Sequence, residues 1–141
     1  MLDTYYILIA GTRTYNDYEE LCYVLDSLLY DISGYYNIEI VQGGAKGADT
    51  LAKKYANAHQ YKRTEKKAKW DLYGKAAGFR RNAEMHDYIK KHDNRICICF
   101  WDGESVGTQH NFILSKDNNT QLYVYDTIQK VVQFLTQRYI Y

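Results

Sequence analysis

The sequence predicts one α/β domain built on a doubly wound, mainly parallel, five-stranded sheet with helices on both faces. Apolar runs with strand character alternate about five times with segments of helical periodicity. Neither an internal repeat nor a linker interrupts this alternation. The length of 141 residues suits a single hydrophobic core, so we expect residues 1–141 to form one domain.

The first half of the chain supplies two strands and two helices. Residues 5–10 form a continuous apolar run, as expected of a strand buried on both faces of a parallel sheet. Asn16 or Asp17 can cap the helix that follows, whose leucines recur at helical spacing. A second strand is expected at 38–42 and a second helix at 48–59.

Residues 60–78 are the hardest part of the chain to assign. The alternation requires a third strand there, but residues 60–69 contain only Tyr61 and Ala68 as apolar residues, so we expect an edge strand at most. Residues 70–78 contain two glycines and are predicted to form a loop.

The second half continues the alternation of strands and helices. In the last expected helix, apolar residues recur at Ile128, Val131, Val132 and Leu135. The expected elements are a helix at 79–91, a strand at 95–101, a helix at 108–116, a strand at 122–125, and a final helix that begins at Asp126 or Thr127.

The composition, with 46% hydrophobic and 25% charged residues, is that of an ordinary globular protein. The net charge of +1 argues against a general nucleic-acid surface, although basic residues cluster between positions 62 and 69. A solvated surface is the alternative explanation for this cluster. Sixteen tyrosines could stack on bases or line an interface, and the end Tyr139-Ile140-Tyr141 could contact another subunit or cover the sheet.

Cysteine usage and hydropathy indicate a cytoplasmic protein. Three cysteines do not make a disulfide framework, and Cys97 and Cys99 share one face of their strand, so we expect buried thiols. We predict no metal ion and no cofactor. No signal peptide precedes the first strand, and no apolar run approaches the ~18 residues of a membrane span.

The stretch 38–49 contains the feature around which we expect a site to form. A β-rich run ends at Gln42, and Gly43, Gly44 and Gly47 follow within five positions. Glycines accept positive φ and let the backbone approach a ligand, and a helix start offers unpaired N–H groups. This geometry suits a phosphate, and the alternative is a tight turn without a ligand.

Three loops should converge on one edge of the sheet. Right-handed crossovers bring the carboxyl ends of parallel strands together, and ligands bind there, at the switch in strand order. The loops are residues 11–13, 43–49 and 102–108.

Side chains in these loops fit a nucleotide. Arg13 could form bidentate hydrogen bonds with a phosphate, or it could form a surface ion pair. Asp49 could accept hydrogen bonds from ribose hydroxyls or stabilise the helix start. Gly107-Thr108 offers a second anion site at a helix start. The aromatic candidates for stacking on a base are Trp70, Tyr73 and Trp101. Each of them could instead pack in the core or on the surface.

Four groups of residues carry a family resemblance. They are Ile9-Ala10-Gly11-Thr12-Arg13, Gly43-Gly44-Ala45-Lys46-Gly47-Ala48-Asp49, Trp70 with Gly74-Lys75-Ala76-Ala77-Gly78 and Arg81-Asn82-Ala83-Glu84-Met85, and Trp101-Asp102-Gly103-Glu104-Ser105-Val106-Gly107-Thr108. Together they resemble the YspA-type, cpYpsA-related branch of the SLOG superfamily. The resemblance implies a Rossmann-like fold, a nucleotide-derived ligand, a role in bacterial or phage conflict, and assembly as a dimer or larger oligomer.

The same superfamily contains LOG phosphoribohydrolases, and the comparison with them bears on catalysis. By this resemblance, Arg81 falls on their catalytic arginine, and Gly107-Thr108 falls on the Gly-Thr of their second motif. Their two glutamates fall on His110 and Asn111 here. Cleavage of an N-glycosidic bond passes through an oxocarbenium-like state that a carboxylate stabilises, and neither residue supplies one. Asp49 or Glu104 could substitute.

Two functional hypotheses follow, and the first is binding of a phosphorylated nucleoside or ADP-ribose-type ligand without turnover, in a sensor or sequestering protein. The second is a LOG-like nucleotide hydrolase with Arg81, Asp49 and His110 as catalytic candidates. A DNA-handling role like that of DprA is disfavoured by the near-neutral charge. We expect the chain to act in the bacterial cytoplasm, and its gene could belong to a phage.

The predicted ligand-binding residues are Gly11, Thr12, Arg13, Gly43, Gly44, Ala45, Lys46, Gly47, Ala48, Asp49, Trp70, Arg81, Asn82, Trp101, Asp102, Gly103, Ser105, Gly107 and Thr108.

Overall fold

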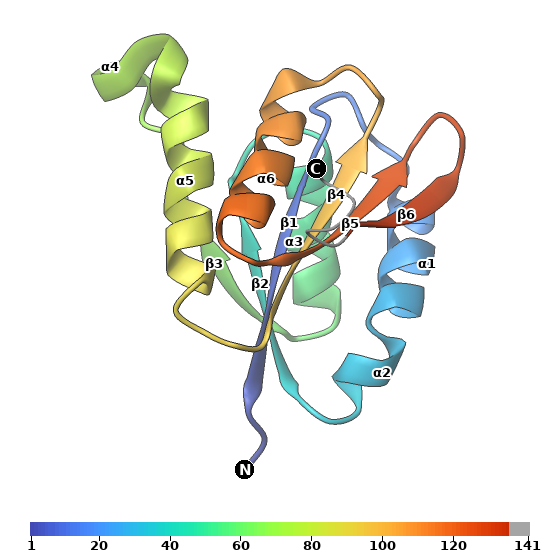
Figure 1. Ribbon diagram of the computed structural model, residues 1–141. Helices are drawn as coiled ribbons and strands as arrows, with labels where there is room; N and C mark the ends of the chain where they lie inside the picture. Colours follow the sequence, from blue (N-terminus) through green and yellow to red (C-terminus); the bar gives the residue numbers. More distant parts are fainter. Residues whose placement is uncertain (136–141) are drawn as a thin grey trace.

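The computed structural model describes residues 1–135, and its centre is a six-stranded sheet with the order β3-β2-β1-β4-β5-β6 (Figure 1). Strands β1 to β5 are parallel, and β6 runs antiparallel to β5. The strands are β1 (Thr4–Gly11), β2 (Asn37–Gln42), β3 (Lys62–Glu65), β4 (Arg95–Trp101), β5 (Gln121–Asp126) and β6 (Val131–Leu135).

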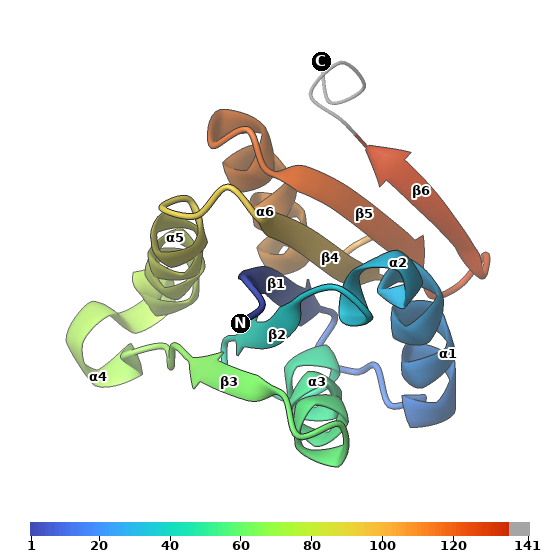
Figure 2. The same cartoon turned by 90° about the horizontal axis from the view of Figure 1, so that it is seen from below.

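Helices cover both faces of the sheet, as Figure 2 shows. α1 and α3 pack on one face, and α5 and α6 pack on the other. The predicted Rossmann-like α/β fold is therefore confirmed. The helices are α1 (Tyr18–Leu28), α2 (Tyr30–Ser33), α3 (Ala48–Ala58), α4 (Trp70–Tyr73), the 3₁₀ turn η1 (Gly74–Ala76), α5 (Ala77–Ile89) and α6 (Val106–Asp117).

Strand β1 shows how the sequence produces the two layers. Ile7 and Ile9 belong to the core under α1 and α3, whereas Leu8 and Ala10 belong to the core under α5. Alternate residues of a strand point to opposite faces, so a strand covered on both sides needs an unbroken apolar run. β1 has such a run and lies between β2 and β4.

The direction of strand order reverses next to β1. The chain builds β2 and β3 on one side of β1 and then returns to build β4 on the other. At this switch the loops after β1 and β4 are joined: the Thr12 N–H donates to the Phe100 carbonyl at 2.9 Å, and Thr12 Oγ1 accepts from the Asp102 N–H at 3.2 Å. This is the edge at which α/β sheets bind ligands.

Residues 60–69, for which the sequence allowed an edge strand at most, do contain one, β3, which pairs with β2. Its charged side chains are compatible with an edge position because they are partly exposed and paired. Arg63 lies 3.2 Å from Glu65, and Glu65 also accepts a 2.8 Å hydrogen bond from Gln42. Charges on an edge strand also disfavour pairing with other chains.

The predicted final helix is wrong, because residues 131–135 form the sixth strand. Asp126 caps a turn instead of a helix: its Oδ1 accepts from the N–H groups of Ile128 and Gln129. Lys130 then adopts a φ of 61° and donates to the Asp126 carbonyl, which reverses the chain.

The apolar spacing after this turn fits a helix and a strand equally well, and the β-branched Val131 and Val132 favour the strand. Tyr139-Ile140-Tyr141, considered above as a subunit contact, lies outside the described residues.

The predicted loop at 70–78 is also wrong. These residues form α4, η1 and the first turn of α5, and α4 projects beyond the end of α5 (Figure 1). Gly74, with a φ of 53°, ends α4, and α5 begins at Ala77 instead of Phe79. No side chain caps α5. The sequence therefore lacks the usual signal for its start.

Two remaining expectations concern the cysteines and the membrane. Cys97 and Cys99 are buried on one face of β4 with their Sγ atoms 3.8 Å apart, as predicted. Residues 1–135 contain no group of three or more His, Cys, Asp or Glu side chains placed to bind a metal ion. No helix within the described part of the chain is long and apolar enough to cross a membrane.

Candidate functional site

A cavity of about 390 Å³ opens at the carboxyl edge of the sheet, where the loops after β1, β2 and β4 meet α5 and α6. Its volume is in the range of small-molecule sites. It is lined by Ala10, Gly11, Thr12, Arg13, Thr14, Ala45, Asp49, Trp70, Lys75, Gly78, Phe79, Arg81, Asn82, Met85, Asp102, Ser105, Gly107, Thr108 and Asn111.

Gly11 allows the elements under this cavity to come together. A Cβ atom there would lie 2.5 Å from the Phe100 carbonyl oxygen and 2.6 Å from the Ala48 Cβ. Because both distances are shorter than contact, a side chain would push β4 and α3 away from β1. Ala48, predicted as a ligand contact, is fully buried in this junction and supports the cavity from below.

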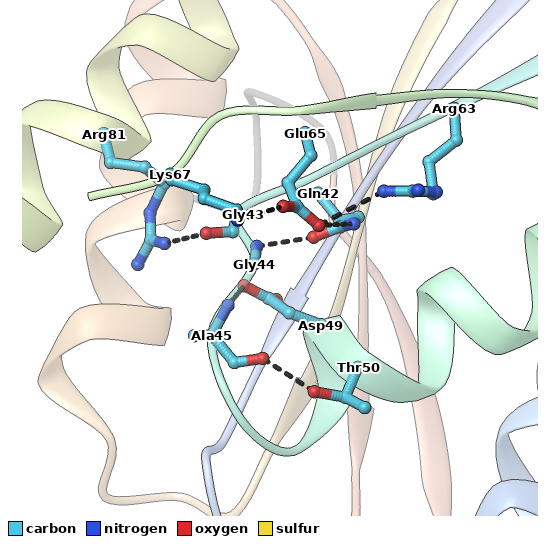
Figure 3. A network of polar contacts seen from close by, with 10 residues as sticks. All are labelled: Gln42, Gly43, Gly44, Ala45, Asp49, Thr50, Arg63, Glu65, Lys67 and Arg81. Atoms are coloured by element: carbon cyan, nitrogen blue, oxygen red, sulfur yellow. Dashed lines mark hydrogen bonds and ion pairs between the residues drawn. The ribbon is translucent and has the colours of Figure 1, made fainter. Parts of the chain in front are cut away.

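The glycine loop (residues 43–47) is held by side chains of its own neighbours (Figure 3). The Gly44 N–H donates to Gln42 Oε1 at 2.5 Å, and the Ala45 N–H donates to Asp49 Oδ2 at 3.1 Å. Both amides of this predicted phosphate loop therefore already have acceptors within the chain. Gly44 takes a φ of 69°, which explains the glycine there.

Gly47 is required by backbone packing. Its φ is 77°, and a Cβ atom would lie 2.3 Å from the Thr12 carbonyl oxygen. The loop after β1 therefore passes directly over the start of α3, and Gly47 lines neither cavity at this edge.

Arg81 reaches from α5 into the centre of the site. Its side chain is 8% exposed, its Nη1 donates to the Gly43 carbonyl at 2.5 Å, and its Nε donates to Asn82 Oδ1 at 3.0 Å. Gly43 has no side chain because the guanidinium occupies that space, with Nη1 2.5 Å from an ideal Cβ. Burial lowers the pKa of Arg81, while the charge of Asp49 opposes the shift.

Asp49 is the buried carboxylate of the site and is 5% exposed. Burial raises its pKa from 3.8 to about 6, and the charge of Arg81 and hydrogen bonds from the Ala45 and Gly43 amides oppose this rise. A carboxyl with this pKa can change protonation near neutral pH, and it lines the cavity.

The start of α6 forms the wall opposite the glycine loop. Asp102 Oδ1 accepts from the Glu104 and Ser105 N–H groups at 2.9 Å each, and Ser105 caps the helix by accepting from the Thr108 N–H at 3.3 Å. The first-turn amides of a helix lack intrahelical acceptors. Gly107, with no atom within 4 Å of an ideal Cβ, leaves this turn open to the cavity.

Two asparagines connect α5 to this turn. The Nδ2 atoms of Asn82 and Asn111 donate to the Gly107 carbonyl at 3.1 and 3.3 Å. Asn111 Oδ1 lies 3.0 Å from the Nε2 of the buried His86. His110, a catalytic candidate, lies 3.4 Å from Asn82 Nδ2 but does not line the cavity. Burial lowers its pKa.

The aromatic candidates divide into one at the cavity and two away from it. Trp70 lines the cavity, is 48% exposed, and has the Arg13 guanidinium 5.3 Å from its ring centre. Trp101 instead donates its indole N–H to the Ser105 carbonyl at 3.1 Å and packs on Phe112. Tyr73 lies under Arg80, away from the cavity lining.

The remaining predicted residues are placed as follows. Gly43, Gly44 and Lys46 line an adjoining cavity of about 480 Å³, and Gly103, with a φ of 87°, lines neither. The lining residues that the sequence did not predict are Ala10 and Thr14 from the end of β1 and the loop after it, Lys75 from η1, Gly78, Phe79 and Met85 from α5, and Asn111 from α6. Lys75 and Gly78 fall in the loop expected at 70–78, and helical spacing after Arg81 could have indicated Met85.

Comparison with known proteins gives a family match and a phage relative. Residues 5–73, which include β1, the glycine loop and β3, match the family described as YspA, cpYpsA-related SLOG. A relative, the Gene 61 protein of Mycobacterium phage D29, is 33% identical over 109 residues, which cover 74% of this chain and 82% of the phage protein.

The chain belongs to the YspA, cpYpsA-related SLOG family. Within this SLOG chain, the matched segment supplies Arg13, Asp49 and Trp70, whereas Arg81 and the start of α6 lie beyond it. Membership indicates a nucleotide-related Rossmann-type protein and leaves the ligand to be inferred from the cavity.

Proposed function

We propose that this SLOG protein binds a phosphorylated nucleoside or an ADP-ribose-type molecule at the carboxyl edge of its sheet, as a sensor or sequestering protein. The observation that carries the proposal is the buried Arg81 guanidinium in the cavity wall. Its two hydrogen-bond acceptors, from Gly43 and Asn82, are uncharged, and no carboxylate in residues 1–135 lies within 4.0 Å in an ion pair. The charge of Asp49 acts on Arg81 without forming such an ion pair, so part of the cost of burying the guanidinium remains and an anionic ligand is favoured.

A phosphate would be bound between Arg81 and the start of α6. The α6 N-terminus carries partial positive charge, and Ser105 and Thr108 add hydroxyl groups to the cavity lining. Their Oγ atoms lie 2.9 Å apart, which places both hydroxyls on one side of the turn. Gly107 keeps this surface free of side-chain bulk.

The nucleoside part would extend from there across the cavity. Asp49 is an acceptor for ribose hydroxyls, since a carboxylate would repel a phosphate in the same place. Trp70 offers a partly exposed ring on which a base can stack, and Arg13 is held over that ring.

Isothermal titration calorimetry with AMP and ADP-ribose tests this proposal. Arg81→Ala is expected to weaken binding by about 1.5–3 kcal/mol, the value of a hydrogen bond to a charged group. Arg80→Ala is the matched control, because Arg80 is exposed on the same helix and lies outside the cavity lining. Equal affinities for wild type and Arg81→Ala would refute the proposed contact.

A nucleotide hydrolase of the LOG type is the second candidate, and Asp49 is the observation that favours it. A buried carboxyl in the cavity with a pKa of about 6 could act as a general acid or base near neutral pH. The position corresponding to a LOG glutamate holds Asn111, which lines the cavity but cannot supply charge. Binding without turnover is therefore the function that we put first.

The similarity to a phage protein supports a role inside a phage-infected bacterial cell, where sequestering a nucleotide signal would alter the infection. We also propose a homo-oligomer. The edge strand β6 exposes Val131 and Val132, and an exposed apolar edge is a pairing surface. Size-exclusion chromatography with light scattering would give the mass in solution, and a monomer would contradict this part.

A further inference from the structure

A second cavity of about 480 Å³ adjoins the first at the same edge of the sheet. The two cavities share Arg13, Ala45, Trp70 and Arg81 in their walls. From these shared residues the second cavity extends along the glycine loop toward the end of β3, whereas the first extends toward α6. A ligand held at Arg81 can therefore reach into both.

The second cavity is lined by cations. Lys46 and Lys67 join the shared Arg13 and Arg81, and no Asp or Glu in the described part of the chain lines it. Lys67 lies 3.6 Å from Glu65, which stands outside the lining. An anionic group in this cavity would meet four positive charges that no lining carboxylate neutralises.

Glu65 cannot cancel this charge by itself. Its side chain is largely buried and also accepts hydrogen bonds from Gln42 Nε2 at 2.8 Å and Arg63 Nη1 at 3.2 Å (Figure 3). The single carboxylate of Glu65 therefore pairs with two cations, Arg63 and Lys67. Lys46, on the other side of the cavity, forms no ion pair with any residue between 1 and 135.

We propose that the second cavity binds a second phosphate group, so that the ligand is a nucleotide with at least two phosphates instead of a monophosphate. This inference rests on the proposed function, which places the first phosphate between Arg81 and α6. Lys46 and Lys67 are then the residues that distinguish the two ligand classes. Both are exposed at the surface, so replacing them leaves the core intact.

The test compares AMP with ADP by calorimetry at low salt, using wild type and the double variant Lys46→Gln/Lys67→Gln. The expected result is a loss of about tenfold or more in ADP affinity with AMP affinity unchanged, because only ADP reaches the lysines. Lys46→Arg/Lys67→Arg should retain ADP binding. Lys69→Gln is the matched control, since Lys69 belongs to the same basic run but lines neither cavity.

The outcomes separate the two proposals. If wild type binds both AMP and ADP, and the double variant changes neither affinity or lowers both equally, the second-phosphate site is refuted. The proposed function would still hold in that case. No binding of AMP, ADP or ADP-ribose to wild type would overturn both. Circular dichroism of each variant confirms that it is folded.

Discussion

Replacing Asp49 by asparagine should change how stability depends on pH. The carboxylate is 5% exposed and accepts a 3.1 Å hydrogen bond from the Ala45 amide, which the side-chain oxygen of asparagine can still accept. The substitution therefore removes the titrating group while keeping the shape of the glycine loop. It tests whether this carboxyl is buried in the folded protein as the structure describes.

The size of the effect follows from the pKa of Asp49. Burial raises it from 3.8 to about 6, so the folded protein binds the proton more tightly than the unfolded chain. The stability that protonated Asp49 contributes is fully present below the pKa of Asp49 in the unfolded chain. It is lost as the pH rises through the pKa of Asp49 in the folded protein. A shift of about two pKa units corresponds to about 3 kcal/mol. Asparagine does not titrate, so Asp49→Asn should gain about that much over wild type between about pH 3.5 and pH 7.5.

Urea unfolding of both proteins across this pH range measures the difference directly. Taking the difference between variant and wild type cancels the titration of the other carboxyl groups. Asp3→Asn is the control for the same substitution at an exposed carboxyl, because Asp3 is exposed near the start of the chain. A constant difference between Asp49→Asn and wild type from acid to neutral pH would refute the assignment of Asp49 as a buried carboxyl.

Three further predictions concern the site, the fold and nucleic acid. Gly107→Phe should abolish nucleotide binding in calorimetry while Gly107→Ala retains it, because only the large ring fills the open turn. Equal nucleotide affinities of the two variants would show that the start of α6 is not part of the site. Gly47→Val should lower the free energy of unfolding by about 2–4 kcal/mol, since its φ is 77° and its Cβ would meet the Thr12 carbonyl; an unchanged urea midpoint would contradict this packing. No tight, sequence-dependent gel shift of DNA is expected at moderate salt, and observing one would overturn the small-molecule assignment.

The sequence was sufficient for the fold where one pattern fitted one structure. The apolar runs of β1 and β4 are short and rich in β-branched and aromatic residues, which favours covered strands over helices. Asp17 caps α1 by accepting from the Glu20 N–H at 3.0 Å. The final segment failed because residues 128–135 satisfy helical spacing and strand propensity together. The turn formed by Asp126 and Lys130 makes this segment a strand instead of a helix. It requires a positive φ at Lys130, which cannot be predicted from a lysine in the sequence.

The candidate site shows a similar division. The three loops could be predicted to converge because parallel strands end at one edge, and side chains from all of them line the cavity. The sequence could not show that the Gly44 and Ala45 amides are already bonded to Gln42 and Asp49, since both contacts depend on side-chain positions. Nor could it show that Gly43 makes room for the Arg81 guanidinium, 38 residues further along the chain.

Binding of a nucleotide-type ligand in the cavity without cleavage is the property on which the proposed function depends. The measurement that tests this most directly is mass spectrometry of the solution after the folded protein is incubated with nucleoside monophosphates, NAD, ADP-ribose and cyclic nucleotides. We expect a bound nucleotide to be recovered intact after denaturation of the protein. Release of free base or ribose phosphate by wild type, and not by Arg81→Ala, would contradict it and show a hydrolase.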